Sequence, residues 1–423
     1  MPKLSNALRA LRYRNYRLFF AGQLISLIGT WMQNVAQSWL VYRLTGSSFL
    51  LGSISFASQI PIFLLAFVGG TIADRYNRHR IVVATQTASL ILALALSVLT
   101  LTGAVRIWHI FVLSILLGVV NAFDMPARQA FVVELVERED LMNAIALNSS
   151  IFNGARVMGP AVAGVLIAGI GEGWCFFANG ISYVAVIAGL LLMKLKPRSG
   201  IRHKESAVSD VLEGFHFVRR TRPIRTLLLL LGLFSIAGMP YSVLMPIFAD
   251  KVLHGGPRGL GILMGATGLG ALIGSGMLAA KSGTRGLGKL IAIASTGFGV
   301  GLVLFSLSRY FWLSAVFLVP VGMSFMMAMA CTNTLIQTIV PDHLRGRVMA
   351  THVWMFLGMT PFGAFLAGAV AAHAGAPTTM LMGAILCLAG AGLFASRMRG
   401  SQLAGPIPIQ THVEFDTDSK NTA

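Results

Sequence analysis

Most of the chain consists of long runs of apolar residues that are separated by short polar stretches. A helix needs about 20 mostly apolar residues to cross a bilayer, and many of these runs reach that length. The pattern predicts membrane-spanning helices over residues 18–42, 49–73, 81–101, 107–131, 141–170, 174–193, 227–248, 260–280, 290–307, 311–339, 348–372 and 378–394. We therefore expect an all-α membrane protein with twelve transmembrane helices.

Composition supports the membrane class. Hydrophobic residues make up 55% of the chain and charged residues only 11%, with a mean hydropathy of +0.75. A soluble domain carries about 25% charged residues, so too few charges are present to cover a water-facing surface. An enzyme embedded in the membrane would need a cluster of acids, bases or metal ligands inside the spans. The spans hold no such cluster, so we do not expect an enzyme.

The basic residues are distributed unevenly between the two sides of the predicted spans. Consecutive connections between spans lie on opposite sides of the membrane. The side that also carries both termini holds roughly 27 Lys and Arg residues, and the opposite side holds 5. Cytoplasmic connections are enriched in these residues, which places both termini and the connection 194–225 in the cytoplasm. The net charge of +18 then fits a membrane surface. No nucleic-acid-binding motif accompanies the scattered basic residues, so nucleic acid is not an expected partner.

The two halves of the sequence repeat weakly. Three arginines precede the first span (12, 14 and 17) and three precede the seventh (220, 222 and 225), at an offset of roughly 200 residues. Six spans followed by six in the same orientation form a parallel repeat, with a site between the halves. We predict a six-helix bundle over 1–193, a linker over 194–225 with an amphipathic helix over 209–220, a second bundle over 226–399, and a disordered tail over 400–423.

Neither a metal nor a cofactor is expected. The cysteines Cys175, Cys331 and Cys387 lack metal or redox spacing. Residues 283–289 fit G-x-x-x-x-G-K, but Leu290 follows where a phosphate-binding loop has Ser or Thr. No cleavable signal is expected either, because the basic leader runs into a span that is too long for a signal-peptide core.

The loop between the second and third spans is the most specific motif. Residues 69–80 read Gly-Gly-Thr-Ile-Ala-Asp-Arg-Tyr-Asn-Arg-His-Arg. This resembles the signature loop of the major facilitator superfamily, Gly-x-x-x-Asp-Arg-x-Gly-Arg-Arg/Lys, and the span count and repeat agree with its two pseudo-symmetric six-helix bundles. The resemblance implies a gate formed by Gly70, Asp74, Arg75, Asn77, Arg78 and Arg80.

Two expectations follow for this loop. Asn77 stands where the family has glycine, and asparagine tolerates a left-handed backbone better than most residues, so the turn can form. The resemblance also implies that Asp74 docks near the start of the eleventh span, at residues 345–351. The partial positive charge at the beginning of a helix would favour that position.

The fifth span contains small residues and a Gly-Pro pair. The stretch from Ala155 through Gly159 and Pro160 to Gly164 resembles the antiporter motif of exporters in this superfamily. Small residues let helices approach closely, and the eighth span, with Gly261, Gly265, Gly268, Gly270 and Gly274, is the expected partner. Generic helix packing is the alternative to an exporter seal.

A charged residue, Arg156, lies inside the same span. A buried arginine is costly in a bilayer, so a partner is expected. We predict contact with Asp124 of the fourth span, with Arg128, one turn from Asp124, as a competitor. The sequence does not decide between two roles for this contact, a structural clamp and a part in proton coupling. The fourth span lacks the arginine-containing motif that many drug/proton antiporters carry.

Polar residues at helical spacing in the first span predict a cavity lining: Gln23, Ser26, Thr30, Asn34 and Gln37. By analogy with the superfamily, other spans add Asn121, Ser235, Tyr241, Ser242, Met326, Met329 and Asn333. Hydrogen bonds between helices are the alternative for each polar residue. The chamber would hold almost no fixed charge, which favours an amphipathic, neutral or polyphenolic substrate.

Within the superfamily, residues 11–19, 31–33 and 124–130 resemble the bacterial enterobactin-exporter-like branch. The resemblance implies a secondary active transporter of the bacterial inner membrane that exports a siderophore, drug or similar molecule by alternating access. We expect proton antiport and a functional monomer. An uptake permease of the same fold, and a membrane sensor that binds without transporting, are the alternatives.

Overall fold

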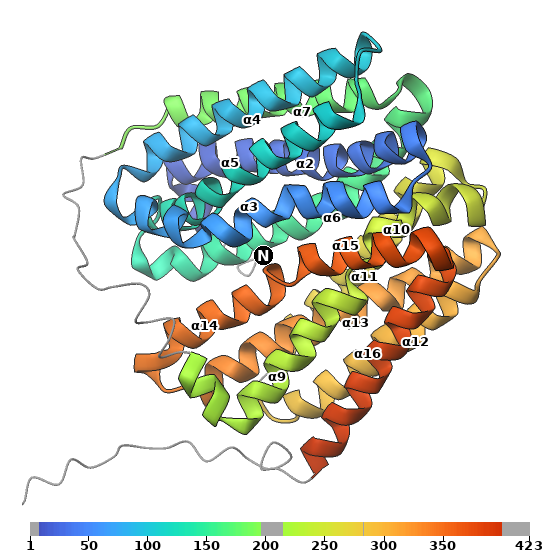
Figure 1. The fold of residues 1–423 in the computed structure, drawn as a ribbon. Helices are drawn as coiled ribbons and strands as arrows, with labels where there is room; N and C mark the ends of the chain where they lie inside the picture. The colour runs from blue at the N-terminus through green and yellow to red at the C-terminus, as the bar shows by residue number, and fades with distance from the viewer. Residues whose placement is uncertain (1–7, 196–214, 282, 400–423) are drawn as a thin grey trace, which may run out of the picture.

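The computed structural model describes residues 8–195, 215–281 and 283–399, and every regular element in these ranges is helical. Eleven helical segments in these ranges are long and apolar enough to cross a membrane. Figure 1 shows these helices arranged in two groups, with the first half of the chain above the second. The predicted all-α membrane class is confirmed.

The first half contributes α2 (Arg14–Thr45), α3 (Ser48–Arg75), α4 (Arg78–Leu101), α5 (Ile107–Glu134), α6 (Leu141–Ile170) and α7 (Glu172–Leu191). All except α2 belong to segments that qualify as membrane spans. The 32-residue α2 is long enough, but its polar residues lower its hydropathy. The sequence feature that predicts a cavity lining therefore also weakens the membrane signal of this helix.

The second half contributes α9 (Arg222–Leu233), α10 (Tyr241–Ile247), α11 (Gly256–Ala279), α12 (Leu287–Leu307), α13 (Phe311–Ile339), α14 (Asp342–Leu357), α15 (Thr360–Ala374) and α16 (Ala376–Arg399). Two spans predicted as continuous are interrupted. The seventh contains the π-helices η3 (Phe234–Gly238) and η4 (Phe248–Val252), with Pro240 between η3 and α10. The eleventh breaks between α14 and α15. Proline removes a backbone donor, which explains the first interruption.

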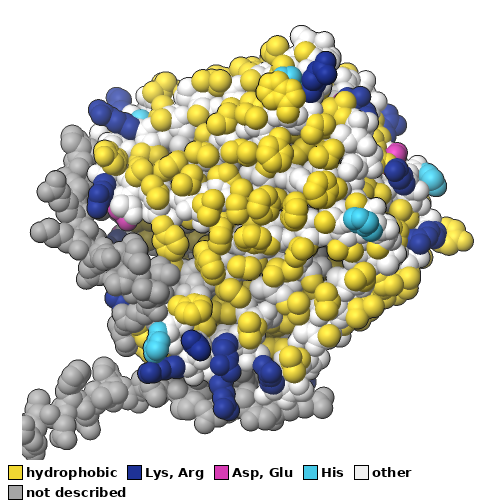
Figure 2. Space-filling view, in the orientation of Figure 1, with side chains coloured by type: hydrophobic (Ala, Val, Ile, Leu, Met, Phe, Trp, Pro, Cys, Tyr) yellow, Lys and Arg dark blue, Asp and Glu magenta, His cyan; other side chains and the backbone are white. Residues whose placement is uncertain are grey.

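The surface of the helices is apolar where a bilayer would surround it. Large hydrophobic side chains are exposed on many helices, including Leu64, Ile91, Val165 and Val316, each more than half accessible. Figure 2 shows hydrophobic side chains across the middle of the molecule and Lys and Arg gathered toward its margins. Exposed apolar surface on this scale marks a membrane-facing protein.

Part of the predicted domain division lies outside the described residues. Only residues 215–220 of the predicted amphipathic helix 209–220 are described, and they are helical, with Phe215 exposed and Val218 buried. Residues 209–214 and the tail 400–423 lie outside the described ranges.

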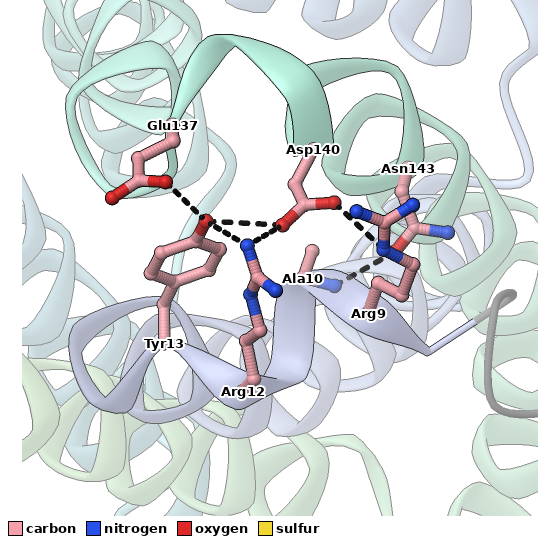
Figure 3. Close-up of polar contacts among 7 residues, drawn as sticks. All are labelled: Arg9, Ala10, Arg12, Tyr13, Glu137, Asp140 and Asn143. Atoms are coloured by element: carbon pink, nitrogen blue, oxygen red, sulfur yellow. Dashed lines mark hydrogen bonds and ion pairs between the residues drawn. The ribbon is translucent and has the colours of Figure 1, made fainter.

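The start of α2 is tied to the start of α6 by an ionic cluster, drawn in Figure 3. Asp140 is buried, with its Oδ1 3.1 Å from Arg9 Nε and its Oδ2 2.7 Å from Arg12 Nη2. The Tyr13 hydroxyl donates to Asp140 at 3.0 Å. The hydrogen bond with Tyr13 and the charge of Asp140 raise the pKa of the Arg12 guanidinium. The cluster fixes α6 against α2.

The two halves meet through close glycine contacts. On α6 and α11, a Cβ added to Gly261 would lie 2.6 Å from the Pro160 carbonyl oxygen and 2.8 Å from Gly164 Cα. On α3 and α15, Gly52 and Gly368 face each other in the same way. Small residues permit such approach, so the predicted partnership of the fifth and eighth spans is confirmed. Gly270 and Gly274 differ, because they pack on α13.

Figure 1 shows the halves in contact near α10 and α15 and diverging toward α14. Aromatic rings continue the contact between α3 and the eleventh span. Phe56 packs on Phe362 and Phe365, and Phe63 stacks on Trp354.

Candidate functional site

A cavity of about 450 Å³ lies between the two halves. The first half lines it with α2, α3, α5 and α6, and the second half lines it with α10, α11, α15 and the residues before α10. Its wall combines apolar side chains with uncharged polar groups and a single guanidinium. A volume of this size fits a small organic molecule.

The structure places some of the predicted cavity residues in this wall and others elsewhere. Five line the cavity: Asn34, Gln37, Asn121, Tyr241 and Ser242. The other seven are not among the lining residues: Gln23, Ser26, Thr30, Ser235, Met326, Met329 and Asn333.

Four of the five polar residues outside the wall have other partners or are buried, and Thr30 is half-buried. Gln23 accepts a hydrogen bond from Arg128 at 2.8 Å, and Ser235 donates to the Phe356 carbonyl at 2.9 Å. Asn333 accepts from Gln337 on the same helix, and Ser26 is buried. For Gln23 and Ser235, the alternative of hydrogen bonding between helices is the correct one.

Sequence reasoning missed a second polar stripe, on α3. Ser55, Ser58 and Gln59 line the cavity, and Ser58 and Gln59 lie three and four residues after Ser55. Ser114 of α5 also lines it and accepts a hydrogen bond from Gln37 at 2.9 Å. The helical spacing of polar residues that identified the α2 stripe would have found the α3 stripe too.

Arg156 is the only Lys, Arg, Asp or Glu that the described residues contribute to the cavity wall. Its Cζ lies 5.8 Å from the Trp31 ring centroid and 6.0 Å from that of Phe325, and the guanidinium interacts with the Tyr241 hydroxyl. A guanidinium within the membrane costs at least about 2.5–3.5 kcal/mol on insertion scales. The described residues therefore give the chamber one fixed positive charge, which the prediction of a cavity with almost no fixed charge did not place there.

The predicted Asp124–Arg156 contact is wrong, and Arg128 is the partner of Asp124. Asp124 is buried, with its Oδ2 3.2 Å from Arg128 Nε. Its Oδ1 accepts hydrogen bonds from Thr85 at 2.8 Å and Gln86 at 2.9 Å. Asp124 and Arg128 are one helical turn apart and share a face, and that face points toward α4 rather than toward the cavity.

The gate loop adopts a simpler conformation than expected. Asn77 has φ −66° and caps α4, its side chain accepting from Arg80 N at 3.1 Å, so the left-handed backbone invoked for Asn77 is not used. Arg78 Nη1 donates to Glu134 at 2.8 Å. The side chain of Asp74 is 73% exposed, with Arg78 Nη2 at 3.5 Å. In this conformation Asp74 therefore faces solvent and Arg78, rather than being buried against α14.

The remaining gate residues differ in exposure. Arg75 and Arg80 are exposed, and a Cβ added to Gly70 would meet open space.

A hydrogen bond joins the two halves beside Val41, which lines the cavity. The Tyr42 hydroxyl of α2 donates to Asp250 Oδ2 of η4 at 2.7 Å, and Lys251 Nζ lies 6.0 Å from the Tyr42 ring centroid. Tyr42 is buried. This contact has no counterpart in the sequence analysis, because it joins residues 208 positions apart.

An all-helical membrane protein with a cavity between two helical halves has the architecture of a secondary transporter. The model of the transmembrane secretion effector family matches residues 5–408. The chain belongs to this family of the major facilitator superfamily, whose members are membrane transporters.

Characterised relatives are similar over most of their length. The staphyloferrin A transporter of Staphylococcus aureus is 27% identical, with 83% of this chain and 88% of the relative covered. The multidrug efflux pump Tap of Mycolicibacterium fortuitum is also 27% identical, with 88% and 93% covered. The enterobactin exporter EntS of Shigella boydii is 27% identical, with 84% and 85% covered.

Solved structures share the fold at low identity. A POT family transporter in complex with 5-aminolevulinic acid aligns with a TM-score of 0.75 at 11% identity, covering 92% of this chain and 96% of that one. An inward-facing bacterial homolog of the human lysosomal transporter Spinster gives a TM-score of 0.72 at 13% identity, covering 94% and 99%.

Proposed function

We propose that this protein is a secondary active exporter that moves a small amphipathic molecule, such as a siderophore or drug, out of a bacterial cell by alternating access. The cavity of about 450 Å³ between the two halves carries this proposal. Under this proposal, α2 is the twelfth membrane span. Residues 1–193 and 226–399 then form two six-helix bundles that rock around the cavity. The exporters among the relatives support the direction.

The proposal assigns the present conformation to the inward-facing state. The distribution of Lys and Arg puts the Tyr42–Asp250 contact on the outer side, and the halves diverge toward α14, on the cytoplasmic side (Figure 1). In the outward-facing state the cytoplasmic ends close, and Asp74 docks at the start of α14, where a helix N-terminus favours a carboxylate. In the present, inward-facing conformation, the glycine contacts of α6 and α11 act as the exporter's seal on the outer side.

Export by proton antiport is tested in everted membrane vesicles from cells that overproduce the protein. We expect respiring vesicles to accumulate members of a panel of catecholate siderophores, citrate-type siderophores and tetracyclines, measured by mass spectrometry. Nigericin, which collapses the pH gradient, should abolish that accumulation. Accumulation confined to right-side-out vesicles would instead identify an uptake permease. Binding of a panel member with flux in neither vesicle type would identify a sensor.

The outer contact gives a prediction about conformation. Tyr42→Phe removes a hydrogen bond to a charged group, a type worth about 1.5–3 kcal/mol, so we expect outward-facing molecules to increase roughly tenfold or more. Labelling of Asn34→Cys in the cavity by a membrane-impermeant maleimide, added outside intact cells, measures this shift. Tyr310→Phe, at a 75% exposed position, is the control. Equal labelling in the two backgrounds would show that the contact does not hold the outer side closed.

A further inference from the structure

Arg156 has no acidic partner in the described part of the chain. The carboxylate expected to neutralise it, Asp124, is bound to Arg128, Thr85 and Gln86. The neighbours of the guanidinium are the rings of Trp31 and Phe325 and the hydroxyl of Tyr241. A cation held inside a membrane protein without a counter-ion indicates a role for its charge.

The surroundings of Arg156 suit a ligand with one anionic group. A guanidinium presents five N–H donors in a planar fork that matches a carboxylate. Asn34 and Asn121 line the same cavity and can donate hydrogen bonds, while Trp31, Pro160 and Met264 supply apolar surface around the fork. No Asp or Glu among the described lining residues would repel an anion.

The position of Arg156 also connects the two halves. Arg156 lies on α6 of the first half, as Trp31 lies on α2, whereas Tyr241 and Phe325 belong to α10 and α13 of the second half. An anion bound here would be held where both halves contribute to the cavity. A positive charge at that point distinguishes charged from neutral molecules of the same shape.

We infer that Arg156 is the binding residue for an anionic group, such as a carboxylate, on an amphipathic substrate whose apolar part packs against the Trp31 side of the cavity. This inference rests on the proposed transport function and specifies its substrate class. It adds an anionic group to the amphipathic, neutral or polyphenolic substrate that the sequence analysis favoured.

The test uses two fluorescent probes that differ in charge alone, 1-pyrenebutyrate and 1-pyrenebutyramide. Binding to the purified full-length protein is measured by fluorescence anisotropy. We expect the wild-type protein to bind the carboxylate at least tenfold more tightly than the amide. Arg156→Gln should bring this ratio close to one by weakening the carboxylate alone, and Arg156→Lys should retain part of it. Arg258→Gln, at an exposed position in the second half, should leave the ratio unchanged.

The outcomes separate this inference from the proposed function. Equal affinity for the two probes in the wild-type protein, or equal weakening of both by Arg156→Gln, would overturn the role of Arg156. The amide affinity of each variant reports whether its cavity is still folded. Transport of both probes in proteoliposomes without preference would leave the exporter standing and refute the anion site. Tighter binding of the carboxylate probe, with no transport of either probe, would support the anion site and refute the exporter.

Discussion

Replacing Gly261 by alanine is expected to reduce transport by about tenfold or more. The added Cβ would lie 2.6 Å from the Pro160 carbonyl oxygen and 2.8 Å from Gly164 Cα, and both obstacles are backbone that cannot rotate away. Overpacking of this kind costs about 1–3 kcal/mol. Because the crowding falls on the contact between α6 and α11, the cost opposes the conformation in which the halves touch there. Initial rates of efflux in proteoliposomes measure the effect.

Gly265→Ala is the matched control for this prediction. Gly265 lies one turn further along α11, and its added Cβ would be 3.8 Å from the Val157 carbonyl oxygen, an ordinary contact. We expect transport close to that of the wild-type protein. Equal loss in both variants would mean that α11 tolerates no methyl group, whatever its distance from α6. Normal transport by Gly261→Ala would refute the close approach itself.

Replacing Asp124 by alanine is expected to lower the free energy of unfolding by about 3 kcal/mol or more, the range found when one partner of a buried ion pair is removed. The change leaves the Arg128 guanidinium without its ion pair and takes the acceptor from Thr85 and Gln86. Unfolding of the purified protein in a titration with sodium dodecyl sulfate measures the loss.

Asp124→Asn should give a smaller loss, because an amide oxygen can still accept from Thr85 or Gln86. Asp342→Ala is the exposed control. Its side chain is 88% accessible and pairs with Arg345 on the surface, so we expect a change of less than about 1 kcal/mol. A stable Asp124→Ala protein that no longer couples flux to the pH gradient would favour the alternative of a proton role over a structural clamp.

The helices themselves follow from local sequence. Apolar length, short polar connections and basic bias are properties of each segment, so the spans and the membrane class could be predicted without knowing any neighbour. Close packing of the fifth and eighth spans was also predictable, since glycine at helical spacing leaves room on one face. The breaks at Pro240 and before Thr360 were missed because the apolar runs were read as continuous, although Pro240 and Pro361 mark both places in the sequence.

The cavity was only partly predictable. Helical spacing puts Gln23, Asn34 and Gln37 on one stripe of α2, but the stripe is longer than the cavity. Its N-terminal end, at Gln23, meets Arg128 instead. The α3 stripe went unrecognised because the helical spacing of polar residues was applied to α2 and not to α3.

What the sequence by itself determined is the all-helical membrane class, the uneven distribution of its basic residues and the small residues that let two helices touch. Only the tertiary structure decided the pairing of charges and the hydrogen bond that joins the two halves. A helix turns 100° per residue, so Asp124 and Arg156, although in adjacent spans of the sequence, point in different directions. Tyr42 and Asp250, far apart in the chain, meet because the two halves pack against each other.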